Sequence, residues 1–282
     1  MGRPIAITCD SACDIPKELQ DKHNLYVIPL NISYDTLNFR DNGTVTTADI
    51  YRICAETNST PKTAAFAPYE AEQLFSKLVA EGYDVIHISL SSELSSCYQN
   101  ALIAKDDNEH VYVVDSKNIS LGQALAVLKA VELRDMGLPA QRIYEDLLYC
   151  VSKTRVGFVL DTLDFIHRGG RCSSLTYLTA NLVQMKVAIK VIDGELKVGK
   201  KYRGKIERIS SKFVDDTLEN INDTDGDIIL ATSGGIDEKV IKDLQKKISK
   251  NFKNKNVQIY NAGCTIASHC GPGTIGIAYI EK

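Results

Sequence analysis

The sequence of 282 residues lacks the marks of a membrane protein, a secreted protein or a nucleic-acid-binding protein. No apolar run approaches the ~20 residues that a transmembrane helix needs. Residues 1–10 enter a strand pattern at once, which leaves no room for a signal peptide. A formal net charge of −3 gives no general attraction to nucleic acid or to an anionic membrane surface. We therefore expect a cytoplasmic protein that binds no nucleic acid and makes at most transient contact with a membrane.

The sequence also lacks any C-x-x-C pair, although it contains eight cysteines. In a reducing compartment we interpret these cysteines as small buried apolar side chains, rather than as disulfides or zinc ligands. A metal cluster of Cys264, His269 and Cys270 is conceivable, but it lacks a second ligand pair at a suitable spacing, so we expect no metal site. The other cysteines are Cys9, Cys13, Cys54, Cys97, Cys150 and Cys172.

The usual signatures of a hydrolase or a phosphate-binding enzyme are missing as well. No G-x-S-x-G nucleophile motif occurs. Residues 233–237 (SGGID) resemble the phosphate loop of ATP pyrophosphatases, but Glu238 replaces its final serine, so we interpret the segment as a helix-capping turn. A hydrolase or phosphoryl-transfer enzyme that uses Asp10, Ser95 and His269 stays open as the alternative function.

Apolar runs alternate with helical patterns through the first half of the chain. Short apolar runs at residues 5–9, 85–90 and 111–115 are typical of buried parallel strands. Because a helical pattern follows each of them, they predict a parallel, doubly wound sheet. The pattern becomes less regular in the second half, so we expect two α/β domains, at residues 1–153 and 154–282.

Several local expectations follow from the residues between the strands. Residues 37–44 are turn-rich, and residues 60–68 are expected to form a loop. Residues 121–136 have the pattern of an amphipathic helix, and residues 175–185 are expected to form another helix. The Asp-Gly pair at 193–194 is typical of the two-residue turn of a β-hairpin.

A serine-rich loop follows the apolar run at 85–90, and the next helix is expected to begin at Ser95 or Ser96. A strand that leads through small residues into a helix directs free backbone N–H groups and the positive end of the helix dipole at one point. This arrangement predicts an anion site. The alternative is that Ser92 or Ser95 only caps the helix. The loop around Thr63 is expected at the same edge of the sheet.

Basic residues are concentrated in two segments of the second half. The loop at 168–171 reads Arg-Gly-Gly-Arg, and Glu207 is the only acidic residue in the segment 197–212. A solvated helix face explains part of this bias. So one-sided a run also predicts an acidic partner or a charged ligand. The basic residues of 197–212 are Lys197, Lys200, Lys201, Arg203, Lys205, Arg208 and Lys212.

Five motifs in the same order resemble the DegV family, the bacterial fatty-acid-binding subunits of fatty acid kinase. The resemblance covers essentially the whole chain. The family patterns are TDS-x-x-D-x-P, PKTSQPSP, ISS-x-LSGTYQ, an arginine loop ending in GGRI, and H-x-GPG-x-x-G. The matching segments are residues 8–16, 61–68, 90–99, 165–172 and 269–276.

The resemblance implies that a long-chain fatty acid lies in an apolar tunnel at the interface of two α/β domains. It places the carboxylate of this fatty acid against Thr63, Ser95 and His269, with Ser96 beside them at the helix start. Hydroxyl groups, a helix N-terminus and an imidazole that converge on one anion agree with the anion site inferred from the serine loop. The bound fatty acid is the expected ligand, and we expect no further cofactor.

The resemblance also implies a carrier and not an enzyme. The carrier would present the carboxylate to a separate fatty acid kinase subunit, and it would pass the acyl phosphate on to phospholipid synthesis. We expect Arg171 and Arg203 to dock this kinase or to stabilise charge on the acyl phosphate. The chain departs from the family pattern at residues 64–66, 96–97 and 184–187. Among these departures, the bulky Phe66 bears on the preferred length and unsaturation of the acyl chain.

Overall fold

The computed structural model describes residues 2–35, 37–57, 59, 61–171, 185–219, 221 and 223–282. Cys172 and all but the last residue of the helix expected at 175–185 lie outside these residues. Among the described residues, no helix is both long enough and apolar enough to cross a bilayer. The seven described cysteines are free thiols, and all except Cys54 are buried.

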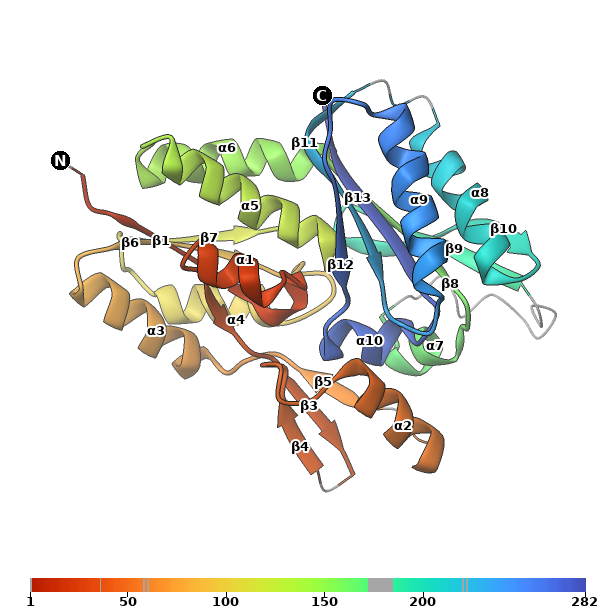
Figure 1. Ribbon diagram of the computed structural model, residues 1–282. Helices are drawn as coiled ribbons and strands as arrows, with labels where there is room; N and C mark the ends of the chain where they lie inside the picture. Colours follow the sequence, from red (N-terminus) through yellow and green to blue (C-terminus); the bar gives the residue numbers. More distant parts are fainter. Residues whose placement is uncertain are drawn as a thin grey trace.

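The first half of the chain forms a four-stranded, wholly parallel sheet in the order β2-β1-β6-β7. Alternate residues of its strands face opposite sides, so that Ala6 packs toward α3 and α4 whereas Ile7 packs toward α5 and α6 (Figure 1). Helices on both faces confirm the predicted doubly wound α/β architecture. The elements are β1 (Ile5–Asp10), α1 (Lys17–Lys22), β2 (Tyr26–Ile28), α3 (Pro68–Ala80), β6 (Asp84–Ser89), α4 (Cys97–Lys105), β7 (Val111–Asp115), α5 (Leu121–Asp135) and α6 (Ala140–Lys153).

The second half of the chain forms a six-stranded mixed sheet in the order β10-β9-β8-β13-β11-β12. Its outer face is covered by α8 and α9, and its inner face packs against α5 (Figure 1). The two sheets thus enclose α5 and α6 between them. The elements are β8 (Thr154–Leu160), α7 (Asp164–Gly169), β9 (Met185–Ile192), β10 (Glu195–Arg203), α8 (Ile206–Leu218), β11 (Thr224–Thr232), α9 (Glu238–Asn251), β12 (Val257–Asn261), α10 (Cys264–Cys270) and β13 (Ile275–Glu281).

The helix predicted for this segment is confirmed as α5, but its amphipathic character is confined to the C-terminal half, because all residues from 121 to 127 are buried. Ten of its fifteen residues are buried. Leu125 and Ala126, which point in different directions around the helix, are both almost inaccessible to solvent. The physical reason is that the N-terminal half of this helix lies between two sheets and has no face left for water, whereas Glu132 and Asp135 of the C-terminal half are exposed. The domain division proposed at residue 153 falls at the junction of α6 and β8, and it stays a prediction.

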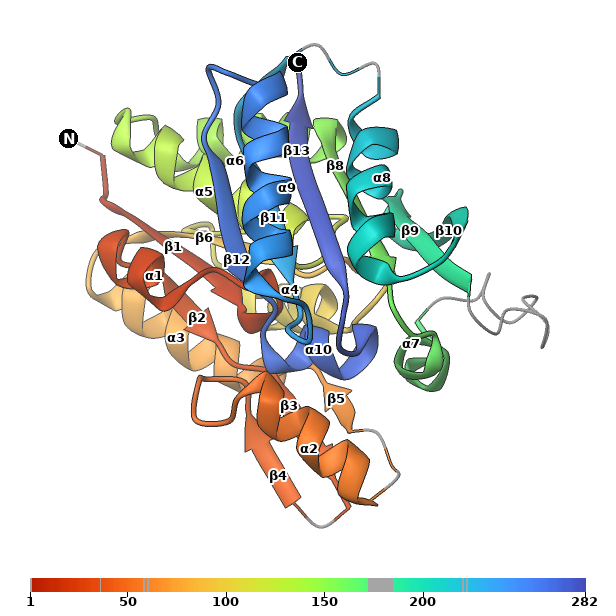
Figure 2. The ribbon, with the colours of Figure 1, turned by 45° about the vertical axis from the view of Figure 1, so that its right-hand side comes forward.

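A small antiparallel sheet in the order β4-β3-β5, together with α2, projects from the main body (Figure 2). Two expectations were wrong in part. The segment 37–44, expected to be a turn, begins with strand β4, and the segment 60–68, expected to be a loop, contains strand β5. These strands have three or four residues, and Leu37 on the edge strand is 53% exposed, so they carry little apolar periodicity. The elements are β3 (Asn31–Tyr34), β4 (Leu37–Arg40), α2 (Thr47–Thr57) and β5 (Lys62–Ala64).

The predicted β-hairpin is confirmed and joins β9 to β10. Asp193 and Gly194 have φ values of +51° and +86°, as a two-residue turn of this kind requires. The hairpin tip reaches the first half of the chain, where Ser91 Oγ donates a hydrogen bond to Gly194 O at 2.8 Å. The hairpin thereby helps to close the space between the two sheets.

Candidate functional site

An open pocket lies where β5, the loop before α4, α7 and α10 meet. Its volume is about 640 Å³. Helices α7 and α10 contact each other at this place. Its polar lining contains the four predicted carboxylate-binding residues and Arg171, so the structure brings five of the six predicted site residues together. These five are Thr63, Ser95, Ser96, Arg171 and His269.

Thr63 and His269 contact each other directly, although 206 positions separate them in the chain. Thr63 Oγ1 and His269 Nε2 are 2.6 Å apart. The strand β5 presents Thr63, and α10 presents His269 near its C-terminus. Burial, together with the nearby positive charge of Arg171, lowers the pKa of His269 to about 4. The imidazole is therefore neutral at neutral pH.

Close packing fixes the ring of His269. A Cβ atom on Gly169 of α7 would lie only 2.3 Å from His269 Nδ1, so only glycine leaves room for the ring at this position. His269 Nδ1 is buried without a hydrogen-bond partner among the described residues. The ring is thus held between Gly169 on one side and Thr63 on the other.

Ser95 and Ser96 stand immediately before α4, as the sequence predicted. Ser95 Oγ accepts a hydrogen bond from Cys97 N at 3.3 Å and donates one to Cys97 Sγ at 3.1 Å, so Ser95 bonds to the first residue of α4 without being its N-cap residue. Ser96 is the N-cap residue, and its side chain makes no capping hydrogen bond. Its hydroxyl group can therefore serve a ligand. The first N–H groups of α4 have no acceptors within the helix, as the anion-site prediction requires.

Arg171 and Arg203 occupy different positions relative to the pocket. Arg171 lines it, and its guanidinium donates to Gly169 O at 2.6 Å. Arg203 is the last residue of β10 and lines neither of the cavities described here. Arg203 pairs with Met185 of the neighbouring strand β9. This pair lies at the same end of the sheet as the last residue of β8, after which the chain continues into α7. The first part of the basic segment 197–212 lies on β10, so only its second part fits the solvated helix face that we considered.

Asp10 does not reach the pocket. It is fully buried, and its carboxylate accepts hydrogen bonds from Leu90 N at 2.8 Å and Gln123 Nε2 at 3.0 Å. Burial raises the pKa of Asp10 to about 6, and these hydrogen bonds oppose that rise. The hydrogen bonds of Asp10 include neither Ser95 nor His269, and His269 bonds to a threonine instead. The three residues of the alternative enzyme hypothesis therefore form no serine–histidine–aspartate relay.

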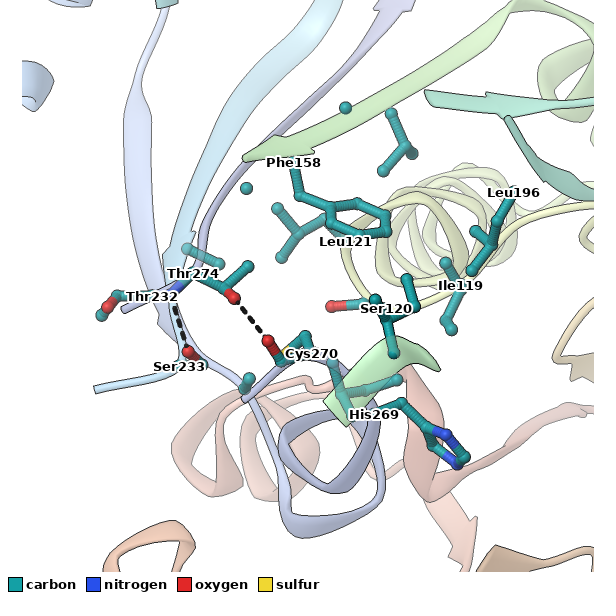
Figure 3. Close-up of a pocket in the computed structure, with 17 residues that line it drawn as sticks. Ile119, Ser120, Leu121, Phe158, Leu196, Thr232, Ser233, His269, Cys270 and Thr274 are labelled. Carbon is teal, nitrogen blue, oxygen red and sulfur yellow. Dashed lines mark hydrogen bonds between the residues drawn. The ribbon is translucent and has the colours of Figure 1, made fainter. Parts of the chain in front are cut away.

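A second, apolar cavity continues from the pocket toward the middle of the six-stranded sheet. It is narrow, with a volume of about 60 Å³, and elements of both halves of the chain line it. Figure 3 shows the Phe158 ring of β8 in this space, facing Leu121, and the His269 ring at one edge. Five residues line both the pocket and this cavity, so the two spaces are adjacent. They are Ile119, Ile166, Leu196, Ile266 and His269.

The sequence analysis missed Thr265, which lies one helical turn before His269. Thr265 lines the pocket, is 4% exposed, and its Oγ1 has no hydrogen-bond partner among the described residues. A buried hydroxyl group without a partner is costly, and a ligand could supply one. The spacing of four residues to His269 was the available signal, but it required a helix at residues 264–270, which the sequence analysis did not predict.

Phe66 lies away from both cavities. Its side chain is fully buried in the core between α3 and the parallel sheet, and its ring packs edge-on against His87. It lines neither the pocket nor the apolar cavity. The expectation that this residue affects the preferred acyl chain therefore has no support from a direct contact.

The described residues contain no group of three or more His, Cys, Asp or Glu side chains that could hold a metal ion. Two members of the cluster considered from the sequence have other partners. Cys264 Sγ donates to Val45 O, and Cys270 Sγ donates to Gly271 O.

Comparison with known proteins identifies the family. Residues 4–282 match the family model described as "Uncharacterised protein, DegV family". The chain belongs to the DegV family. A DegV domain-containing protein of Clostridium acetobutylicum is 30% identical over 282 residues, which cover 99% of each chain. One from Caldanaerobacter subterraneus is 29% identical over 280 residues, again covering 99% of each chain.

Solved structures of DegV proteins have the same fold. A DegV family protein from Thermus thermophilus, described as fatty-acid-binding, has a TM-score of 0.89 at 25% identity. The match covers 99% of this chain and 100% of that chain. A stearic-acid-binding protein from Eubacterium ventriosum has a TM-score of 0.84 at 23% identity, with 100% and 99% coverage. The predicted membership of the DegV family and the predicted α/β fold are thus confirmed.

Proposed function

We propose that this DegV protein binds one long-chain fatty acid without covalent attachment. The carboxylate would lie in the polar pocket, against Thr63, Ser95, Ser96 and His269. The acyl chain would follow the adjacent apolar cavity between the two sheets. The observation that carries the proposal is this adjacency of a polar pocket and an apolar cavity, with His269 lining both. The fatty-acid-binding description of the Thermus thermophilus relative supports it.

The polar groups suit a carboxylate. A neutral imidazole that donates from Nε2 to Thr63 Oγ1 leaves the threonine hydroxyl proton free for the ligand. The N-terminus of α4 and the hydroxyl groups of Ser95 and Ser96 add donors on the other side. Hydrogen bonds to a charged group are the stronger kind. This arrangement favours a fatty acid over an uncharged lipid.

The apolar cavity suits an acyl chain, provided that it widens. Burial of ~15 methylene groups at ~0.8 kcal/mol each would contribute up to ~12 kcal/mol before ordering costs. A space of about 60 Å³ is smaller than an acyl chain needs, so side chains such as Phe158 and Leu196 must move when the ligand enters. We expect the bound lipid to be retained tightly once the side chains have closed around it.

The resemblance stated above supports a further step, in which the carrier presents the carboxylate to a separate fatty acid kinase. The pocket is open to solvent, so a partner can reach the head group of the ligand. Arg171 lines this opening, and Arg203 lies at the same end of the larger sheet. In this proposal the DegV chain supplies no catalysis. It carries the acyl phosphate toward phospholipid synthesis.

Alanine substitutions of Thr63, Ser95 and His269, which we call the clamp, test the proposal. Thr63→Ala and Ser95→Ala should each weaken palmitate binding by about 1.5–3 kcal/mol, because each removes a hydrogen bond to a charged group. His269→Ala should weaken it as well, because the Thr63 hydroxyl group then loses the donor that directs its proton toward the carboxylate. Isothermal titration calorimetry of delipidated protein measures the effect. Ser152→Ala, in the exposed last turn of α6, is the control and should leave affinity unchanged. Wild-type affinity in all three clamp variants would contradict the proposed carboxylate site.

A further inference from the structure

Helix α10, which carries His269, has no capping side chain of its own, because its N-cap residue is Gly263. The first N–H groups of a helix have no acceptor within that helix. A helix of seven residues also has little stability in isolation. Its orientation must therefore come from contacts with the rest of the molecule.

Two aspartates from distant segments supply the missing acceptors. Asp14 Oδ1 accepts from Gly263 N at 2.8 Å. The carboxylate of Asp41 accepts from Cys264 N at 3.1 Å and from Thr265 N at 3.0 Å. Three consecutive N–H groups at the start of α10, those of the N-cap Gly263, of Cys264 and of Thr265, thus have carboxyl oxygens as acceptors, and negative charge near a helix N-terminus is stabilising.

Both aspartates are themselves fixed. Ser120 Oγ donates to Asp14 Oδ2 at 2.5 Å, and Ser11 Oγ lies 3.3 Å from Asp41 Oδ2. A Cβ atom on Gly263 would lie 3.0 Å from Asp14 Oδ1, so the absence of a side chain permits the close approach. The N-terminus of α10 is therefore tied to the loop after β1 and to the segment after β4.

The side chains that face the pocket lie on the same helix. Thr265 and His269 are four residues apart, which places them on one face of α10. The N–H of Thr265 is one of the groups that Asp41 holds, and His269 bonds to Thr63 one turn later. A shift of the helix N-terminus would therefore displace both pocket-facing side chains together.

We propose that Asp14 and Asp41 are positioning residues for carboxylate recognition. They hold α10 so that Thr265 and His269 point at the ligand head group, and neither aspartate lines the pocket itself. This inference rests on the proposed fatty acid binding. It gives a role to Asp14 of the N-terminal motif at residues 8–16, which the ligand site alone leaves unexplained.

The test compares head-group selectivity, using palmitate and hexadecanol, which share a tail of the same length. Asp41→Asn keeps the side-chain size but replaces one of two acceptor oxygens, each of which faces an N–H group, with a donor. Asp14→Asn also keeps the size and replaces the oxygen that faces either Gly263 N or Ser120 Oγ, so Asp41→Asn is the more stringent variant. The ratio of palmitate affinity to hexadecanol affinity should fall about tenfold, because displaced clamp residues weaken binding of the charged carboxylate more than binding of the alcohol. A purely structural weakening would lower both affinities and leave the ratio unchanged.

Asp237→Asn is the matched control. Asp237 caps α9, where its carboxylate accepts from Lys239 N at 2.8 Å, and it lines neither cavity. The affinity ratio should stay at the wild-type value in this variant. If Asp14→Asn does not fold, Asp41→Asn alone decides the matter, because Asp41 is less deeply buried.

Two failures are distinguishable. A wild-type ratio in the folded Asp41→Asn variant, together with a lowered ratio in His269→Ala, would overturn the positioning role and leave fatty acid binding intact. A wild-type ratio in both variants, or no palmitate binding by the unmodified protein, would overturn the proposed function itself.

Discussion

His269 lines both the pocket and the apolar cavity, and burial keeps its imidazole neutral. The pKa of about 4 in the folded protein lies below the ordinary value of 6.5. Between these two values the unfolded chain binds more protons than the folded chain at this site. The contribution of His269 to stability is therefore fully present above pH 6.5, and it is lost progressively as the pH falls toward 4.

A comparison of wild type with His269→Gln isolates this contribution. Other shifted groups, such as Asp10, Asp14 and His87, are present in both proteins and cancel in the difference. We expect the wild type to lose free energy of unfolding relative to the variant between pH 6.5 and pH 4, measured by urea denaturation at several pH values. Parallel curves for the two proteins would contradict a buried, neutral His269.

At the scale of elements, the β9–β10 hairpin closes the apolar cavity, because Leu196 on β10 lines both spaces. Its tip at Gly194 has a φ of +86°, and a Cβ atom there would lie 2.6 Å from Ser91 Oγ. Gly194→Ala should therefore add strain and also break the Ser91–Gly194 hydrogen bond. We expect a loss of ~2–3 kcal/mol in the free energy of unfolding, measured by urea denaturation.

Gly226→Ala is the control for backbone strain alone. Gly226 has a φ of +77°, and an added Cβ atom would meet nothing within 4 Å. This variant should lose only the ~1–2 kcal/mol of the left-handed conformation. Equal losses in the two variants would mean that the contact between the hairpin tip and Ser91 adds nothing to stability.

The elements also show which parts of the fold a single sequence can predict. The long strands and helices of the main body were predicted because their apolar runs are continuous or periodic. Strands β4 and β5 were missed because three or four residues at the edge of a small sheet have no such period. The burial of the N-terminal half of α5 on all sides was missed for a different reason. A second sheet, formed from residue 154 onward, covers the other face of this helix, and no pattern within the helix itself indicates that.

The candidate site was predictable where a family motif names the residue, and not elsewhere. Thr63, Ser95 and His269 come from three such motifs, and the structure gathers them in one pocket. Thr265 and Asp41 lie outside these motifs, and their roles depend on α10 and on the contact between distant segments. Such contacts are set by the tertiary fold, so no local pattern announces them.

At the scale of the whole molecule, the basic residues at the end of the larger sheet bear on partner binding. Lys197 and Lys200 are paired with Glu195 and Asp216. Within the described part of the chain, exposed Arg203 has no ion pair, so its charge is available to a partner. In the segment 197–212, the exposed residues Lys201, Lys205, Arg208 and Lys212 likewise have no ion pair with a described residue.

If the proposed kinase partner exists, Arg171→Ala and Arg203→Ala should retain bound fatty acid but slow its phosphorylation by that kinase. Charges at the rim of an interface mainly set the association rate, so wild-type turnover should also fall steeply with salt. Kinase-coupled turnover of lipid-loaded protein measures both effects. Lys246→Ala, on exposed α9, is the control. Wild-type rates in both arginine variants would contradict the docking role.

The most direct test of the central claim is to extract the purified native protein with organic solvent and to identify the released lipid by mass spectrometry. We predict one long-chain fatty acid per chain, because the polar pocket and the apolar cavity together suit that ligand. His269→Ala protein, purified in parallel, should retain less of it. An extract without stoichiometric fatty acid, from a protein that turns over simple ester or phosphate substrates, would contradict the carrier function.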